Sequence, residues 1–107
     1  MTRARLPNRR PSLVQEITYR GQPISVTIGF DGIVPREVFA NGARDGSDMQ
    51  HILSDACVMI SIALQHGVAA SELAHSLGTV PAVVDGEEMD VPASPIGAII
   101  GCLSEAV

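Results

Sequence analysis

Lysine and tryptophan are absent from this 107-residue sequence, and its aromatic side chains are limited to one Tyr and two Phe. Because 46% of the residues are hydrophobic and only 3% are aromatic, any packed core must be aliphatic. No apolar run approaches the roughly 20 residues that span a bilayer. Arginine and proline stand near the N-terminus, where a signal peptide has an apolar stretch, so we expect a cytoplasmic protein without membrane contact.

Cysteine is scarce as well. Cys57 and Cys102 form no Cys-x-x-Cys motif, and both fall in apolar helical patterns. This placement gives no support to a zinc site, a redox motif or a disulfide scaffold. We interpret both residues as buried thiols, since a free cysteine behaves as a small apolar residue.

Positive charge is confined to the first part of the chain. Residues 1–44 carry seven arginines and three acids, a net charge of +4, whereas residues 45–107 carry nine acids and no base. An arm over residues 1–12 contains two prolines and no periodicity, so we expect it to be extended. It is either a solvated tail or a segment that binds a partner or an acidic surface. The candidate contact residues in this arm are Arg5, Arg9 and Arg10.

The length predicts one domain, which follows the arm over residues 13–107. Apolar residues alternate from Ile24 to Phe30, as in a half-buried strand. Turn signals at Arg20-Gly21 and Asp31-Gly32 flank this strand. Because Pro35 lacks the N–H that a central strand needs, the last strand should be an edge strand or begin just after it. The pattern predicts three antiparallel strands at about 13–20, 23–30 and 33–40.

A long helix is predicted over residues 48–66. Ser47 and Gln50 have the spacing of a capping box, and Gly67 ends the helical pattern. A helix with so wide an apolar arc is covered on two sides. We expect its own sheet on one side and another helix or a second subunit on the other. The narrow polar face consists of Gln50, Ser54, Ser61 and Gln65.

Two shorter helices complete the predicted fold. Residues 69–78 form the first, which Gly78 should close in a left-handed conformation. Residues 79–93 contain two prolines and four acids and are expected to form a loop. Ser94 and Pro95 begin the final helix, in which Gly97 and Gly101 would let another helix approach closely. The predicted class is α+β: a three-stranded antiparallel sheet packed on a long central helix, with two shorter helices.

The turn before the long helix has the composition of an anion site. Gly42, Arg44, Gly46 and Ser47 precede a helix N-terminus, whose free N–H groups and dipole can hold a phosphate. Their spacing matches neither a P-loop nor a dinucleotide fingerprint. Glycine is also needed in such turns for geometry alone, so a structural explanation competes with ligand binding.

No cluster of residues indicates catalysis, a metal ion or a cofactor. His51 has Asp55 one turn further along, a pair that is usual on a helix surface. His66 and His75 have no second ligand at metal-binding spacing. Residues 63–78 imitate a helix-turn-helix, but the segment has no cationic side chain to bind phosphate. We therefore expect no DNA binding.

Four segments carry a family resemblance: "RLPNRRPS" (5–12), "VTIGFDG" (26–32), "EVFANGARDGSDMQHILSDA" (37–56) and "ISIALQHGV" (60–68). In this order they resemble the small C-terminal domain of adenosylcobalamin-dependent (class II) ribonucleotide reductases, a family named for a Thr-Ser-Cys-Pro-Asp motif. The chain lacks that motif, a terminal cysteine pair and a cobalamin-binding sequence. The resemblance thus implies the fold and not the radical chemistry, and the arm looks like the connector to the reductase barrel.

The resemblance implies a non-catalytic accessory or regulatory module that acts through protein contacts in deoxyribonucleotide synthesis. A reductase catalytic chain is the expected partner. The alternative is an independent nucleotide- or small-anion-binding protein that uses the turn at residues 42–47. A homodimer through the apolar arc of the 48–66 helix is a further hypothesis. We expect no enzyme activity from this chain alone, no cofactor, no catalytic residue and no metal-binding residue.

Overall fold

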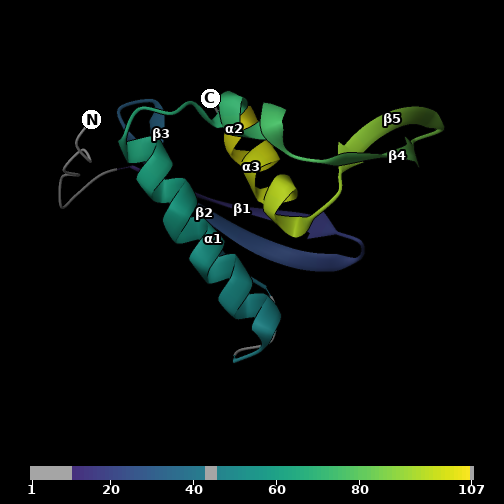
Figure 1. Cartoon of the computed structure of the whole chain (residues 1–107), viewed down its shortest axis with the longest axis horizontal. Coiled ribbons are helices and arrows are strands. Elements are labelled where there is room, and N and C mark those ends of the chain that lie inside the picture. The colour runs from purple at the N-terminus through teal and green to yellow at the C-terminus, as the bar shows by residue number, and fades with distance from the viewer. Residues whose placement is uncertain (1–10, 43–45, 107) are drawn as a thin grey trace.

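The computed structural model describes residues 11–42 and 46–106 and shows a three-stranded antiparallel sheet covered by helices on one face (Figure 1). The predicted α+β fold is confirmed, and a small second sheet adds to it. The elements, in chain order, are β1 (Ser12–Tyr19), β2 (Gln22–Asp31), β3 (Val34–Asn41), α1 (Asp48–Gln65), α2 (Ala70–Ser76), β4 (Thr79–Val84), β5 (Glu87–Pro92) and α3 (Pro95–Glu105).

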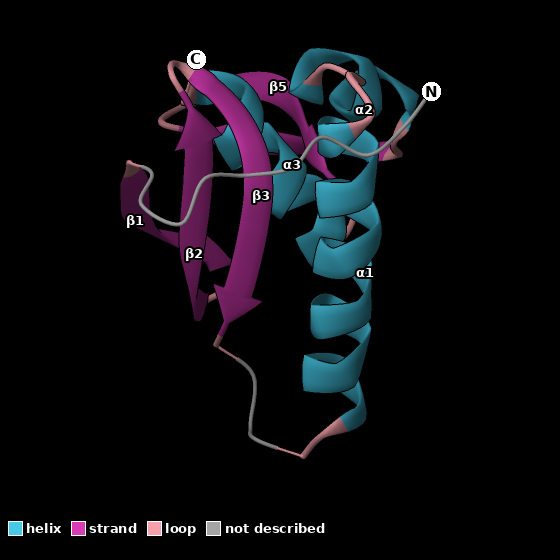
Figure 2. Cartoon of the chain, turned by 90° about the vertical axis from the view of Figure 1, so that its left-hand side faces the viewer, coloured by secondary structure: helices cyan, strands magenta, loops and turns pink. Residues whose placement is uncertain are grey.

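The sheet has the strand order β1-β2-β3. Arg20 (φ +49°) and Gly21 (φ +80°) connect β1 to β2 in a two-residue turn that suits the right-handed twist of the strands. The register of β2 and β3 shifts between Gly29 and Phe30, next to the pairing of Phe30 with Pro35. As the proline indicated, β3 is an edge strand (Figure 2).

The core lies between one face of the sheet and the helices. Ile24, Val26 and Ile28 alternate along β2 and are almost completely buried. Side chains from α1 and α3 pack against them in one aliphatic cluster, which is the kind of core that the composition predicts. The most deeply buried helix residues are Leu53, Leu64, Ile99 and Leu103.

The polar face of α1 is largely turned away from solvent, and of its four residues only Ser54 is exposed. This face lies against the outer edge of β3. The buried hydroxyl of Ser61 accepts a hydrogen bond from the Val38 N–H (3.0 Å) and donates to the Val38 carbonyl (3.3 Å). The side-chain amide of Gln65 donates to the Arg36 carbonyl at 3.1 Å. The helix therefore satisfies the backbone groups of this edge strand with its own side chains.

Only half of the predicted capping box forms at the start of α1. The Ser47 hydroxyl accepts from the Gln50 N–H at 3.2 Å, as expected. The Gln50 side chain, however, donates to the Ala40 carbonyl (3.3 Å) and to Ser54 (3.0 Å). The Gln50 side chain therefore serves a carbonyl group on the edge of β3 and not the helix cap.

Much of the apolar arc of α1 is consequently exposed. Another helix, one of the two covers that we expected, is not found along most of α1 within the described residues, because α3 meets α1 only slightly and packs mainly on α2. Cover by a second subunit stays a prediction. The exposed apolar side chains of this helix are Met49, Ile52, Val58, Met59 and Ile62. Within the described part of the chain, no helix covers them.

The C-terminus of α1 is fixed to β3. The Arg36 guanidinium donates to the Leu64 carbonyl at 2.6 Å, and Gly67 (φ +92°) ends the helix as predicted. The last turn of α1 has no basic residue of its own. Arg36 therefore supplies the positive charge that a helix C-terminus favours.

Two expectations for the second half of the chain are wrong. α2 ends at Ser76, and Gly78 does not have a positive φ, so it is not a left-handed cap. Residues 79–93 are not a loop, because β4 and β5 pair through a two-residue turn at Asp85 (φ +51°) and Gly86 (φ +81°). Prolines are tolerated here because both strands of a two-stranded sheet are edges. This hairpin extends away from the helices (Figure 1).

The start of α3 has the predicted cap. The Ser94 hydroxyl accepts from the Gly97 N–H at 3.0 Å, and Pro95 occupies the first turn. A Cβ on Gly97 would lie 3.2 Å from Cβ of Pro92, whereas a Cβ on Gly101 would meet nothing within 4 Å. The described residues thus bring no second helix to Gly101. None of the helices in the described ranges is both long and apolar enough to cross a membrane.

Candidate functional site

The turn before α1 is organised by backbone packing. A Cβ on Gly42 would lie 2.5 Å from the Pro23 carbonyl oxygen and 2.8 Å from Cα of Ile24. The Gly42 carbonyl also accepts a hydrogen bond from the Gln22 side chain at 2.7 Å. Gly42 is therefore required for close approach to β2, which is the structural explanation for this glycine.

Two further residues of the predicted anion site, Gly46 and Ser47, also have structural roles. Gly46 has a φ of +75°, which favours glycine, and the Ser47 hydroxyl caps the helix. Arg44 lies outside the described residues, as do Arg5, Arg9 and Arg10 of the arm. Anion binding at this turn and partner binding by the arm stay predictions.

A cavity that the sequence did not reveal opens beside this turn. It has a volume of about 520 Å³, which is in the range of small-molecule sites. We call it the Arg20 groove, because the Arg20 side chain stands in its wall with the guanidinium carbon 5.3 Å from the centre of the Tyr19 ring. Its lining residues are Tyr19, Arg20, Gln22, Ile24, Ser47, Met49, Leu53 and Pro95.

Four separate segments build the Arg20 groove, which explains why sequence reasoning missed it. The β1–β2 turn and the starts of β2, α1 and α3 each contribute a wall. One hydrogen bond ties two of these walls together, since the Tyr19 hydroxyl donates to the Ala93 carbonyl at 2.9 Å. The only local signal was Arg20 itself, a non-glycine residue at a turn position that takes a positive φ.

Both cysteines are buried, as predicted. Burial raises the pKa of the Cys57 thiol to about 11, and a hydrogen bond with the backbone of Ala40 offsets part of that effect. The pKa of Cys102 is also raised, first by burial and then by the negative charge of Glu105. Thiols with raised pKa values are poor nucleophiles, because the thiolate is the reactive form.

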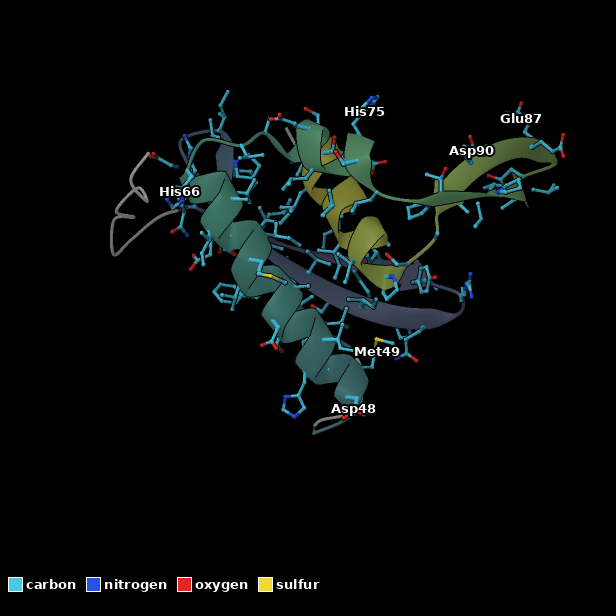
Figure 3. All side chains as sticks on the ribbon, in the orientation of Figure 1. Asp48, Met49, His66, His75, Glu87 and Asp90 are labelled. Atoms are coloured by element: carbon cyan, nitrogen blue, oxygen red, sulfur yellow. The ribbon has the colours of Figure 1, made fainter. Side chains whose placement is uncertain are left out.

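The histidines and acidic residues are dispersed. His66 lies at the end of α1 and His75 on α2, whereas Glu87 and Asp90 lie on the hairpin (Figure 3). In the ranges that the structure describes, no three His, Cys, Asp or Glu side chains come close enough to hold a metal ion.

Comparison with protein families matches residues 2–107 to the TSCPD domain. This chain belongs to the TSCPD domain family. Searches of curated proteins and of solved structures found no match. The resemblance carried by the four sequence segments is therefore confirmed at the level of the family, and the match includes most of the arginine-rich arm as well as the folded part of this TSCPD domain.

This TSCPD domain does not contain the Thr-Ser-Cys-Pro-Asp motif for which its family is named. At the start of α3, Pro95 follows Ser94, whose hydroxyl caps the helix.

Proposed function

We propose that this TSCPD domain is a non-catalytic accessory or regulatory module, related to the C-terminal domain of class II ribonucleotide reductases. It acts through protein contacts in deoxyribonucleotide synthesis. The observation that carries the proposal is the family match over residues 2–107, which spans both the arm and the folded domain. A reductase catalytic chain is the proposed partner.

The state of the thiols supports a non-catalytic role. With a pKa of about 11, only about one Cys57 side chain in 10⁴ is ionised at pH 7. Cys102 is likewise buried, with a raised pKa. Neither residue has the exposed, easily ionised thiol that electron relay to a reductase requires.

The surface supports protein contacts. Fifteen large apolar side chains of the described residues are exposed, against ten Ile, Leu and Val side chains that are buried. Single exposed apolar residues are ordinary, but groups of them mark interaction sites. Two such groups are present here, with five of the fifteen on α1 and three, Val80, Val84 and Met89, on one face of the β4–β5 hairpin.

Capture of the tagged protein from its native cells tests the proposed partner. The intact chain is compared with a chain lacking residues 1–12, and bound proteins are identified by mass spectrometry. We expect a reductase catalytic chain with the intact protein only. A matched variant of full length, with Arg5, Arg9 and Arg10 changed to Gln, should behave like the truncated chain if charge makes the contact. Absence of a reductase from all three captures contradicts the proposal.

The Arg20 groove favours a second candidate, an independent nucleotide- or small-anion-binding protein. The groove has the volume of a small-molecule site, and it places a cationic side chain near the start of a helix. Calorimetric titration with a deoxynucleoside triphosphate tests this candidate. Binding should be lost in Arg20→Gln and in Arg44→Ala, and an absence of heat with the wild-type chain excludes it.

A further inference from the structure

The two edges of the main sheet differ in whether their outward backbone groups are hydrogen-bonded. The outer edge of β3 is occupied, because α1 side chains bond to the Arg36 carbonyl, to both backbone groups of Val38 and to the Ala40 carbonyl. At the other end of the sheet, β1 lies farthest from α1, and no described strand pairs with its outer edge (Figure 2). In the described ranges, no side chain or backbone group bonds to its outer edge.

The register identifies the free groups on β1. Tyr19 and Gln22 flank a two-residue turn, so they form a hydrogen-bonded pair. Such pairs alternate along the strand, which means that Tyr19, Ile17, Gln15 and Leu13 bond to β2. The N–H and C=O groups that point outward, eight in all, therefore belong to the other four residues: Ser12, Val14, Glu16 and Thr18.

β1 has few of the features that usually protect an edge strand from pairing. It is eight residues long and contains no proline and no lysine or arginine. Its pairing with β2 runs from Ser12 to Tyr19 without a bulge. The outward carboxylate of Glu16 is its only charge. An edge of this kind is a template for a further strand.

We propose that β1 pairs with β1 of a second copy of this chain. The two strands run antiparallel across a two-fold axis and join two three-stranded sheets into one sheet of six strands. This pairing concerns the sheet edge, so it differs from the hypothesis of a dimer through the apolar arc of α1. It also goes beyond the proposed accessory role, because it requires no reductase.

The register of this pairing follows from parity and charge. A two-fold axis perpendicular to the sheet keeps the helix-facing residues of both copies on one face. Each residue must then lie opposite a residue that points to the same face. The axis is therefore level with one residue of β1, which lies opposite its own copy, and not level with a peptide bond between two residues. With the axis at Gln15, all eight outward groups of each strand find partners, since Ser12 faces Thr18 and Val14 faces Glu16. With the axis at Glu16, two carboxylates would face each other directly. We therefore place the axis at Gln15.

Apolar contacts agree with the axis at Gln15. This register sets Leu13 of one copy opposite Ile17 of the other, on the face that carries the helices. Leu13 is 43% exposed in the single chain, and Ile17 is only half-buried. Because of the two-fold symmetry, this contact between Leu13 and Ile17 would form twice, once on each side of the axis. In this register a second copy bonds all the outward backbone groups of β1, keeps the two Glu16 carboxylates from facing each other and sets apolar side chains opposite apolar side chains. These three features favour a second copy as the partner of β1.

Light scattering over a series of protein concentrations tests for the dimer, which should have twice the 11.2 kDa of the chain. The variant Glu16→Pro removes one outward N–H and leaves the bonds between β1 and β2 intact. It should be folded by circular dichroism and monomeric. A wild-type protein that stays monomeric overturns the proposal, and so does a Glu16→Pro dimer as stable as that of the wild type.

Disulfide cross-linking tests the register of the β1–β1 pairing. It does not depend on whether the proline variant folds. In Gln15→Cys, the two new cysteines would be a directly opposed pair about 4.5 Å apart at Cα, a distance that a disulfide can bridge. A mild oxidant should convert this variant to a covalent dimer. The matched control, Glu16→Cys, should remain uncross-linked, and the native cysteines are buried. Cross-linking of the control alone, or of neither variant, contradicts the axis at Gln15.

Discussion

Removing one hydroxyl from α1 should destabilise this protein far more than its size suggests. In Ser61→Ala the helix keeps its packing, and the change in volume is a single oxygen atom. The Val38 N–H and C=O groups, however, point away from β2 and lose the hydroxyl that is their partner among the described residues. Each buried backbone group left without a partner costs about 1–3 kcal/mol. The bond at 3.3 Å is weaker than the bond at 3.0 Å, so we expect a total loss of about 2–4 kcal/mol.

Urea unfolding followed by far-UV circular dichroism measures this loss. The protomer concentration must be the same for all variants, because association would shift the apparent stability. Ser54→Ala is the matched control on the same helix, since Ser54 is exposed and bonds only to the Gln50 side chain. It should change the free energy of unfolding by less than about 0.5 kcal/mol. Equal effects of the two substitutions would refute the account of α1 as the partner of the β3 edge.

Three further predictions follow from burial and hydrogen bonding. Ile60→Asp places a carboxylate in the core and should abolish the folded circular dichroism spectrum, whereas the neighbouring Met59→Asp, at a side chain that is 66% exposed, should leave it unchanged. Because the folded state raises the pKa of Cys57 from 9.0 to about 11, the free energy of unfolding should be unaffected by this thiol below pH 9 and should fall between pH 9 and pH 11. Urea titrations of the wild type and Cys57→Ala at pH 8 and pH 10.5 isolate that fall, and parallel pH dependences would contradict it. Tyr19→Phe loses the bond to the Ala93 carbonyl and should lower the free energy of unfolding by about 1 kcal/mol in the same assay, and no measurable change would show that this bond contributes nothing.

Local signals in the sequence were sufficient for most elements of the fold. Alternation from Ile24 to Phe30 with a turn on each side predicted the sheet, and the caps at Ser47 and Ser94 predicted where two helices begin. These signals depend on interactions between residues that are close in sequence, so contacts between distant segments do not change them. The hairpin at 79–92 was missed because its prolines and acids outweighed the Asp-Gly turn that closes it.

Features that depend on contacts between distant segments were not predictable in this way. A serine on a helix looks the same in sequence whether it faces water or a strand edge, so the role of Ser61 emerged only with Val38 beside it. The Arg20 groove likewise needs four segments in place before it exists. The same limit applies to the candidate anion site, where sequence composition could not separate the steric need for Gly42 from ligand binding.

The β4–β5 hairpin has a consequence for the motions of this protein. Within the described residues, its two strands contact mainly each other, and β5 has a small contact with α3. Isolated two-stranded hairpins are marginally stable in water, so this unit can open and close while the main sheet and α1 stay folded. Its backbone amides should then exchange with deuterium long before those of β2. A peptide inserted between Asp85 and Gly86 would alter that local equilibrium and leave the global unfolding transition where it is, which makes this turn a natural position for a fluorescent or affinity label.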